Sequence, residues 1–212
     1  SAVSYARYVV LDAQGLIAAP GFIDITSHAD ASGSLFLNPR QDYLVTQGVT
    51  SILAGNCGSS LAPLVSREAA ASLRKWSAGQ EININWLTME NYLAELARHP
   101  LGVNVGTLMG HGTIRRGITK GASRPLSIEE TSQFLSLITA GMQEGAFGLS
   151  AGLVYGHEAA ATPEEFAAFA KAIARGKGVL KAHLRNEGQN LVPAMNEIIQ
   201  AGRESKAICS VQ

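Results

Sequence analysis

The sequence predicts an α/β fold in which parallel strands alternate with helices. Short apolar runs are separated by longer segments with helical periodicity, the pattern of successive β-then-α units. A helix between each pair of strands makes the strands parallel, because the crossover returns the chain to the same end of the sheet. With 212 residues, 46% of them hydrophobic and 16% charged, the chain can bury a sizeable core. This composition excludes a disordered or fibrous protein.

Charge and cysteine content exclude several classes of protein. Lys plus Arg balances Asp plus Glu at 17 each, so there is no basic excess to bind nucleic acid or an anionic membrane. No apolar run approaches the roughly 20 residues of a membrane span. Cys57 and Cys209 are too few for a disulfide framework. We therefore expect a soluble cytoplasmic protein that binds neither nucleic acid nor membranes.

The apolar runs give the predicted strands, and the first buried run follows the Pro20-Gly21 turn. Two capping boxes mark helix starts: Ser127 with Glu130, and Thr162 with Glu165, where Pro163 suits the first helical position. The basic stretch that follows Thr113, with Arg115, Arg116, Lys120 and Arg124, is expected to be irregular. The predicted strands span residues 5–11, 22–26, 49–54, 103–109, 147–150, 179–184 and 207–211, and the predicted helices span 42–47, 66–76, 89–98, 128–144, 163–175 and 191–205.

Side chains with ligating or polar chemistry follow successive strands at their carboxyl ends, where sites lie in both doubly wound sheets and (β/α)8 barrels. No Gly-x-Gly-x-x-Gly or P-loop lysine follows a strand, which disfavours a nucleotide-binding fold. Imidazole and thiolate from separate strands suit Zn²⁺. Taken singly, Cys57 could instead be a small buried hydrophobe and His183 a core histidine. The candidate residues are His28, Cys57, His111, Tyr155, His157 and His183.

Several segments resemble the N-acyl-D-amino-acid deacylases (D-aminoacylases) of the amidohydrolase superfamily. The resemblance covers nearly the whole chain, and the Asn-Cys-Gly and His-Leu-Arg-Asn-Glu segments are its most specific parts. The Pro-Gly-Phe-Ile-Asp segment identifies only the superfamily. The matching segments are residues 19–24, 47–50, 55–58, 61–64, 110–115, 145–150, 152–155 and 183–187.

The resemblance implies a metal-dependent hydrolase (β/α)8 barrel, of which residues 20–212 would form the N-terminal part with five to six strands. Residues 1–19 would form the edge of a small β-sandwich domain. The implied activity is zinc-dependent hydrolysis of the amide of an N-acyl-D-amino acid to a carboxylate and a free D-amino acid. In this family the substrate is a small molecule, and neither nucleic acid nor a membrane is a partner.

The resemblance also implies roles for individual residues. His28, Cys57 and His183 match zinc ligands, and Tyr155 matches a tyrosine that lines the substrate pocket. Arg185 is expected to bind substrate; with Glu187 it could orient the ligand or substrate, although a solvated ion pair in the loop is an equal alternative. Packing is the better interpretation of His111, and His99 and His157 are expected to be solvated.

The sequence departs from the family pattern at Thr26, which stands where the first histidine of a His-x-His pair is expected. Because threonine is a poor zinc ligand, we expect weaker metal binding on that side, and the number of metals stays open. The family's strand-six histidine and its catalytic aspartate would lie beyond Gln212. We therefore expect a portion of a larger protein, or an assembly whose remaining strands lie on another chain. The alternatives are an amidohydrolase for a cyclic amide or dipeptide, and a non-catalytic remnant.

Overall fold

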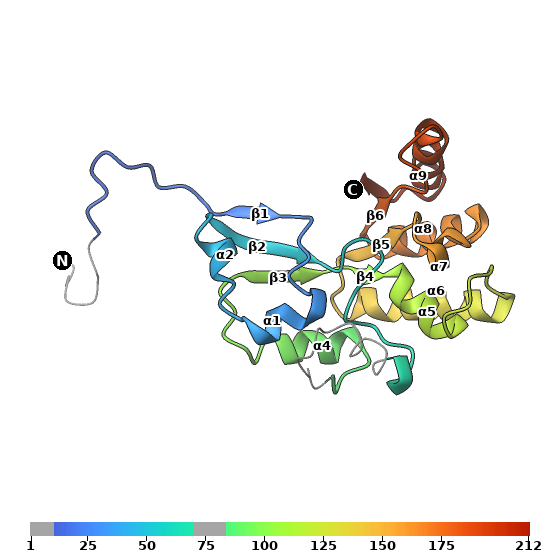
Figure 1. The fold of residues 1–212 in the computed structure, drawn as a ribbon, viewed down its shortest axis with the longest axis horizontal. Coiled ribbons are helices and arrows are strands. Elements are labelled where there is room, and N and C mark those ends of the chain that lie inside the picture. The colour runs from blue at the N-terminus through green and yellow to red at the C-terminus, as the bar shows by residue number, and fades with distance from the viewer. Residues whose placement is uncertain (1–10, 70–83) are drawn as a thin grey trace.

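The computed structural model of the protein describes residues 11–69 and 84–212 as two β-sheets with helices packed beside them (Figure 1). The first sheet has the order β1-β2-β3, and the second has the order β4-β5-β6-β7. Every strand pair is parallel, as predicted. In the described residues the strands are Phe22–Asp24 (β1), Val49–Ala54 (β2), Asn104–Thr107 (β3), Met109–Gly110 (β4), Gly148–Gly152 (β5), Val179–His183 (β6) and Ile208–Val211 (β7).

The predicted strand over residues 103–109 is divided at Leu108. Its first part, β3, pairs with β2, whereas its last part, β4, pairs with β5. The Leu108 N–H donates to the Ala54 carbonyl at 2.9 Å, and the Phe147 N–H donates to the Thr107 carbonyl at 2.9 Å. These two bonds join the sheets, so the loops after strands of the two sheets can meet.

The predicted helices that lie within the described residues form close to their predicted bounds. Ser127 and Glu130 make the reciprocal bonds of a capping box, and Thr162 caps the helix that has Pro163 in its first turn. The helices in the described part of the chain are Ser34–Leu37 (α1), Asp42–Val45 (α2), Met89–Leu96 (α4), His111–Thr119 (α5), Ile128–Gln143 (α6), Gly156–Ala159 (α7), Pro163–Arg175 (α8) and Leu191–Ser205 (α9), with a short 3-10 helix, η2, at Ala31–Gly33.

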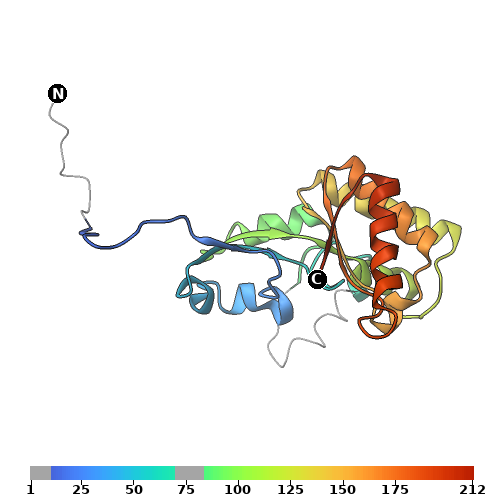
Figure 2. The ribbon, with the colours of Figure 1, turned by 90° about the horizontal axis from the view of Figure 1, so that it is seen from above.

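The longer helices pack beside the second sheet through an apolar core. Phe134 of α6 stacks on Phe169 of α8, with ring centroids 4.2 Å apart. Leu149 of β5 and Leu180 of β6 are fully buried. Figure 2 shows α8 and α9 lying along this sheet. This packing fixes β5 and β6, whose carboxyl ends carry part of the candidate site.

The prediction of an irregular basic stretch after Thr113 is wrong for its first part, because α5 continues to Thr119. Two glycines lower the intrinsic helix propensity of this segment. The segment nevertheless buries Ile114 and Arg115 completely. The Arg115 guanidinium donates to Glu165 at 2.7 Å and to the Arg124 carbonyl at 2.7 Å. Tertiary contacts of this kind override a weak local preference.

Two predictions at the N-terminal side lie partly outside the described residues. The predicted strand over residues 5–11 is described only at Leu11, which is not in a strand. The segment of residues 11–20 runs away from the sheets as an irregular chain (Figure 1). The predicted helix over residues 66–76 is described to residue 69 and is helical from Arg67. The division of the chain into two domains stays a prediction.

Candidate metal centre

The three predicted zinc ligands lie together in the structure. Cys57 Sγ lies 3.5 Å from His28 Nε2 and 3.8 Å from His183 Nδ1. A tetrahedral zinc ion with Zn–S of about 2.3 Å and Zn–N of about 2.0–2.1 Å separates its sulfur and nitrogen ligands by about 3.6 Å. Both distances fit that spacing. Within residues 11–69 and 84–212, however, no group of three or more His, Cys, Asp or Glu side chains meets the geometric criteria for a formed metal site.

Each of these side chains comes from the end of a parallel strand. His28 follows β1, Cys57 follows β2, and His183 is the last residue of β6. Because all three strands run in the same direction, their carboxyl ends deliver the side chains to one edge. The placement at strand ends agrees with the expected one, and the role of the three residues as zinc ligands stays a prediction.

The Cys57 thiol sits on a tight loop with unusual backbone geometry. Cys57 has φ +53°, between Gly55 at +76° and Gly58 at +75°. Residues other than glycine adopt this left-handed conformation at an energetic cost. The conformation that positions the Cys57 thiol therefore lowers the local stability of the loop. Burial raises the pKa of the Cys57 thiol, while the nearby Lys181 ammonium opposes that rise. Burial therefore disfavours the thiolate form of Cys57, and a cation beside the thiol favours it.

Ser150 fastens the Cys57 loop to the second sheet. Its Oγ accepts a hydrogen bond from the Gly58 N–H at 3.0 Å and donates to the Gly55 carbonyl. Ser150 lies in β5 and is fully buried. One hydroxyl thus bonds the backbone on both sides of the cysteine. Sequence reasoning missed this residue because nothing local marks Ser150 as a partner of residues about 95 positions earlier.

Asn56, beside the cysteine, joins three strand ends. Its amide group donates to the Ser27 carbonyl after β1 and to the Leu53 carbonyl in β2, both at 2.8 Å. Its Oδ1 accepts from Lys181 Nζ at 2.9 Å and from Gln212 Nε2 at 2.9 Å. All the hydrogen-bonding capacity of this buried amide is used. Asn56 therefore holds the loops after β1 and β2 and the β6 strand in fixed relation.

Lys181 places a buried positive charge next to the thiol. Its ammonium donates to the Ile25 carbonyl, to Thr26 Oγ1 at 2.8 Å and to Asn56 Oδ1 at 2.9 Å. Burial lowers the pKa of Lys181, and the Cys57 thiolate opposes that shift. Lys181 was missed at the sequence level, although it lies two residues before His183. The period of two in a strand puts both side chains on one face, and that signal could have found it.

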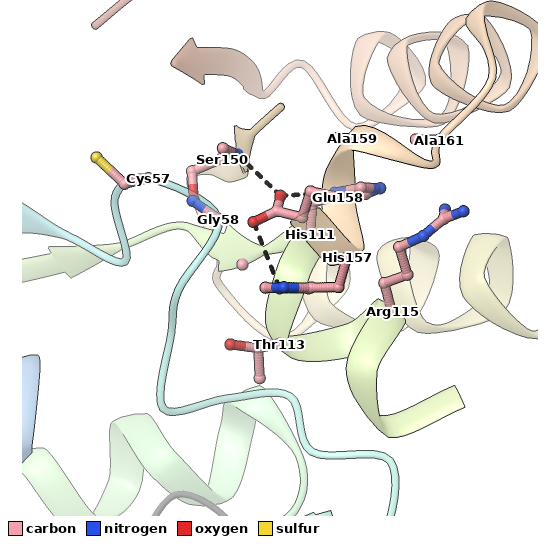
Figure 3. A network of polar contacts seen from close by, with 12 residues as sticks. Cys57, Gly58, His111, Thr113, Arg115, Ser150, His157, Glu158, Ala159 and Ala161 are labelled. Atoms are coloured by element: carbon pink, nitrogen blue, oxygen red, sulfur yellow. Dashed lines mark hydrogen bonds and ion pairs between the residues drawn. The ribbon is translucent and has the colours of Figure 1, made fainter. Parts of the chain in front are cut away.

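Behind the Cys57 loop, a buried carboxylate is paired with a buried histidine (Figure 3). Glu158 Oε2 lies 2.7 Å from His111 Nδ1 and accepts from the Gly152 N–H at 2.8 Å. His111 has no exposed side-chain surface and packs against Phe134 and Phe169, which agrees with the expected packing role. The pair fixes the end of β5 beside the loop.

The two histidines expected to be solvated are half-buried instead. His157 lies 3.1 Å from an Arg116 guanidinium nitrogen, and burial together with this cation lowers the pKa of His157. His99 packs edge-on against Phe36, with ring centroids 5.1 Å apart. Neither residue shares a described contact with Cys57, so both lie outside the candidate centre.

Glu187 and Tyr155 surround the ring of the candidate ligand His183. Glu187 Oε1 lies 3.0 Å from His183 Nε2, so a carboxylate holds the ring nitrogen that faces away from Cys57. Carboxylates in this position orient metal-binding histidines. Tyr155 lies beside the same ring, with centroids 5.8 Å apart. Arg185 pairs with Glu197 through two hydrogen bonds rather than with Glu187.

Four of the five N–H groups of Arg185 are used within the protein. Two of these four groups donate to Glu197, as described above. The other two donate to the Ala159 and Ala161 carbonyls, at 2.6 and 3.0 Å. This leaves one N–H group for any contact with a substrate. The predicted substrate role of Arg185 stays a prediction, and its observed contacts tie the loop after β6 to α9 and to the segment after α7.

Known proteins resemble the chain in sequence. It is 37% identical over 196 residues to the N-acyl-D-aspartate deacylase of Alcaligenes xylosoxydans xylosoxydans and 34% identical over 201 residues to the D-aminoacylase of that organism. These matches cover 92% and 94% of the chain but only 39% and 40% of the relatives. The chain thus spans about two fifths of the length of the curated relatives that it matches. No protein-family profile matches the chain.

Solved structures resemble the chain in fold. A D-aminoacylase described as defining a novel subset of amidohydrolases matches with a TM-score of 0.81 at 31% identity, over 91% of this chain and 40% of that one. Another D-aminoacylase structure matches with a TM-score of 0.81 at 30% identity. It is described as having a binuclear metal centre in which one metal activates and a second metal attenuates. The N-acyl-D-glutamate deacylase of Bordetella bronchiseptica, complexed with zinc and a phosphonate inhibitor, matches with a TM-score of 0.78 at 27% identity.

The fold and the relatives agree with each other. The seven parallel strands of the described residues, with their helices, correspond to part of a metal-dependent hydrolase barrel. Within the described residues, no helix is both long and apolar enough to cross a membrane. By sequence and by fold, the chain is a homologue of the N-acyl-D-amino-acid deacylases, the D-aminoacylase group of the amidohydrolases.

Proposed function

We propose that the chain supplies the zinc-binding side of an enzyme that hydrolyses N-acyl-D-amino acids to a carboxylate and a free D-amino acid. His28, Cys57 and His183 would hold the zinc ion. The observation that carries this proposal is the convergence of one thiol and two imidazoles from three strand ends, at sulfur–nitrogen distances of 3.5 and 3.8 Å. The relatives that the chain matches are deacylases of this substrate class by name.

Zinc held there would supply Lewis-acid chemistry: it would lower the pKa of water toward about 7 and polarise the acyl carbonyl. Other residues of this chain would hold the candidate ligands in position. Glu187 holds the outer nitrogen of the His183 ring, which leaves Nδ1 directed at Cys57. Ser150 and Asn56 hold the Cys57 loop at a fixed distance from β1 and β6.

The substrate would lie beside the metal ligands. Tyr155 is half-exposed and lies next to the His183 ring, so it would line the pocket with an aromatic face and a phenol group. The free N–H of Arg185 could reach the carboxylate of an acylated amino acid. A reducing cytoplasmic setting belongs to this proposal, because a zinc-binding thiol has to stay reduced; Cys57 and Cys209 are both free.

Metal content tests the site. The 212-residue chain, reduced and dialysed against zinc, is expected to retain about one zinc per chain by elemental analysis, and Cys57→Ser should lose it. Cys209→Ser is the matched control, because Cys209 is the other free cysteine and lies in β7 away from the loop. Absence of zinc in the unmodified chain, or full retention in Cys57→Ser, would contradict the assignment.

Cobalt gives a second readout that does not depend on activity. Cobalt bound by a thiolate gives a charge-transfer absorption in the near ultraviolet, which should be present in the unmodified chain and in Cys209→Ser but absent in Cys57→Ser. Hydrolysis of N-acetyl-D-amino acids, compared with their L enantiomers, tests the reaction in the longest protein that contains this chain. Equal rates on both enantiomers would contradict the proposed substrate class.

A further inference from the structure

We infer that Lys181 limits the metal centre to one ion, because its ammonium occupies the place beside Thr26 that a second cation would need. The inference rests on the proposed zinc site. It concerns the side of that site toward β1, where the sequence lacks an expected histidine.

The ammonium is held where oxygen ligands would otherwise face a metal. Lys181 Nζ donates to the Ile25 carbonyl, to Thr26 Oγ1 and to Asn56 Oδ1. An ammonium group has three N–H donors, so these three acceptors satisfy it completely. The same acceptors are thereby turned toward the lysine and are not available to a second ion.

The substituted residue and the new charge are in direct contact. Thr26 stands where the resemblance places the first histidine of a pair, and its hydroxyl lies 2.8 Å from Lys181 Nζ. An imidazole pointing the same way from position 26 would meet the ammonium. The missing imidazole at position 26 and the Lys181 ammonium beside it therefore both act against a second metal ion at the same place.

Charge acts in the same direction as geometry. Lys181 is 3% exposed, so its charge is poorly screened by water. The anionic groups that act on its charge are the Cys57 thiolate and Asp24. One zinc ion bound by Cys57 already neutralises the thiolate. A second divalent ion beside it would face the ammonium with little anionic compensation. A D-aminoacylase of similar fold, by contrast, is described with a binuclear metal centre.

Metal stoichiometry distinguishes the two arrangements. The chain is titrated with zinc in the presence of a competing chelator, and bound metal is counted per chain by elemental analysis. The unmodified chain is expected to saturate at one zinc. The double variant Thr26→His, Lys181→Met restores an imidazole and removes the charge at similar side-chain length, and it is expected to saturate at two zinc ions per chain under the same conditions.

A control variant separates the effect of the Lys181 charge from the effect of removing any lysine charge. Lys171→Met removes an exposed lysine of α8 and should leave the stoichiometry at one. If the double variant does not fold by circular dichroism, Thr26→His, Lys181→Gln replaces it, since glutamine keeps a donor toward Asn56 without the charge. Two zinc ions on the unmodified chain, or one zinc on a folded double variant, would overturn the inference. No zinc on the unmodified chain would overturn the proposed function and the inference with it.

Discussion

At the scale of single residues, removal of the Ser150 hydroxyl should weaken both folding and metal binding. Ser150→Ala removes the hydroxyl that bonds Gly58 and Gly55. We expect a loss of about 1–3 kcal/mol in the free energy of unfolding, because two buried backbone groups lose a partner. Zinc affinity should fall about 10–100-fold, because the ligand loop is no longer fixed. Denaturant unfolding and chelator competition measure the two effects.

Ser136→Ala is the control for this substitution. Ser136 is exposed on α6, and its hydroxyl bonds only the backbone of its own helix, at Ser132. Its removal should leave zinc affinity unchanged. An equal loss of affinity in the two variants would show that Ser150 has no special role in holding the loop.

The glycine that begins the Cys57 loop gives a second prediction. Gly55 has φ +76°, and a Cβ built on it would lie 2.2 Å from the Leu108 carbonyl oxygen. Gly55→Ala therefore combines left-handed strain with a backbone clash, and we expect it to cost about 3–5 kcal/mol in the free energy of unfolding. Gly121→Ala, at φ +84° with nothing within 4 Å of the new Cβ, should cost only the strain, about 1–2 kcal/mol. Thermal or denaturant unfolding compares them; similar losses would mean that the Leu108 contact relaxes.

The candidate ligands could be predicted from the sequence, but most of their supports could not. His28, Cys57 and His183 each follow a recognisable strand, and parallel strands bring such positions together. Ser150 and Asn56 act through bonds to residues far away in the chain, which depend on which strands become neighbours. Local patterns carry no information about that pairing. Lys181 is the exception, since its spacing from His183 was visible.

At the scale of elements, the start of α6 should make part of the stability depend on pH. Glu130 accepts from the Ser127 N–H at 2.8 Å and makes two bonds of 2.7 Å to Arg124. The Arg124 pair and then the Ser127 N–H lower the pKa of Glu130 from 4.5 to about 2. A lowered pKa in the folded state stabilises the fold above the ordinary pKa and loses that effect as the pH falls toward the folded value.

The measurement is the stability of Glu130→Gln relative to the unmodified chain across pH. The unmodified chain should be more stable at neutral pH, and the difference should shrink as the pH falls from 4.5 to about 2. Arg124→Gln keeps the capping box but removes the ion pair, so it should lose the larger part of this pH dependence. A difference that stays constant down to pH 2 would contradict the explanation.

Helices whose ends are marked by neighbouring residues in the sequence were predicted well. Elements that depend on contacts between distant residues were not. The capping residues Ser127 and Thr162 marked two helix starts that the structure confirms. Helix α5 was missed because its stability comes from burying Arg115 against Glu165, 50 residues away. The division of a strand at Leu108 was missed because it reflects a change of strand partner, and the apolar run continues through it.

At the scale of the whole molecule, two of the outer strands of the described sheets, β1 and β7, have an unpaired edge. β1 pairs only with β2, and β7 pairs only with β6. Both carry exposed apolar side chains, including Ile23 at 68% and Ile208 at 68%. Such edges promote pairing with other chains. We expect the 212-residue chain to self-associate as its concentration rises, in sedimentation velocity or light scattering.

A lysine on the edge should reduce this association. Ile23→Lys places a charge on β1, whereas Ile128→Lys, at an equally apolar and 85% exposed position at the start of α6, leaves both edges unchanged. The first substitution should shift the chain toward monomer and the second should not. A concentration-independent monomer, or equal effects of the two variants, would contradict edge pairing.

The spacing of the candidate ligands along the chain fixes the order in which the centre can assemble during synthesis. Cys57 follows His28 by 29 residues, but His183 follows Cys57 by a further 126. A nascent chain can bring the first two together once β1 and β2 have paired, and it then has to wait for β6. Contacts over such separations form late, because the loop-closure entropy is lost before they add stability. Zinc capture would therefore report that the second sheet has formed, and it could not guide the first steps of folding.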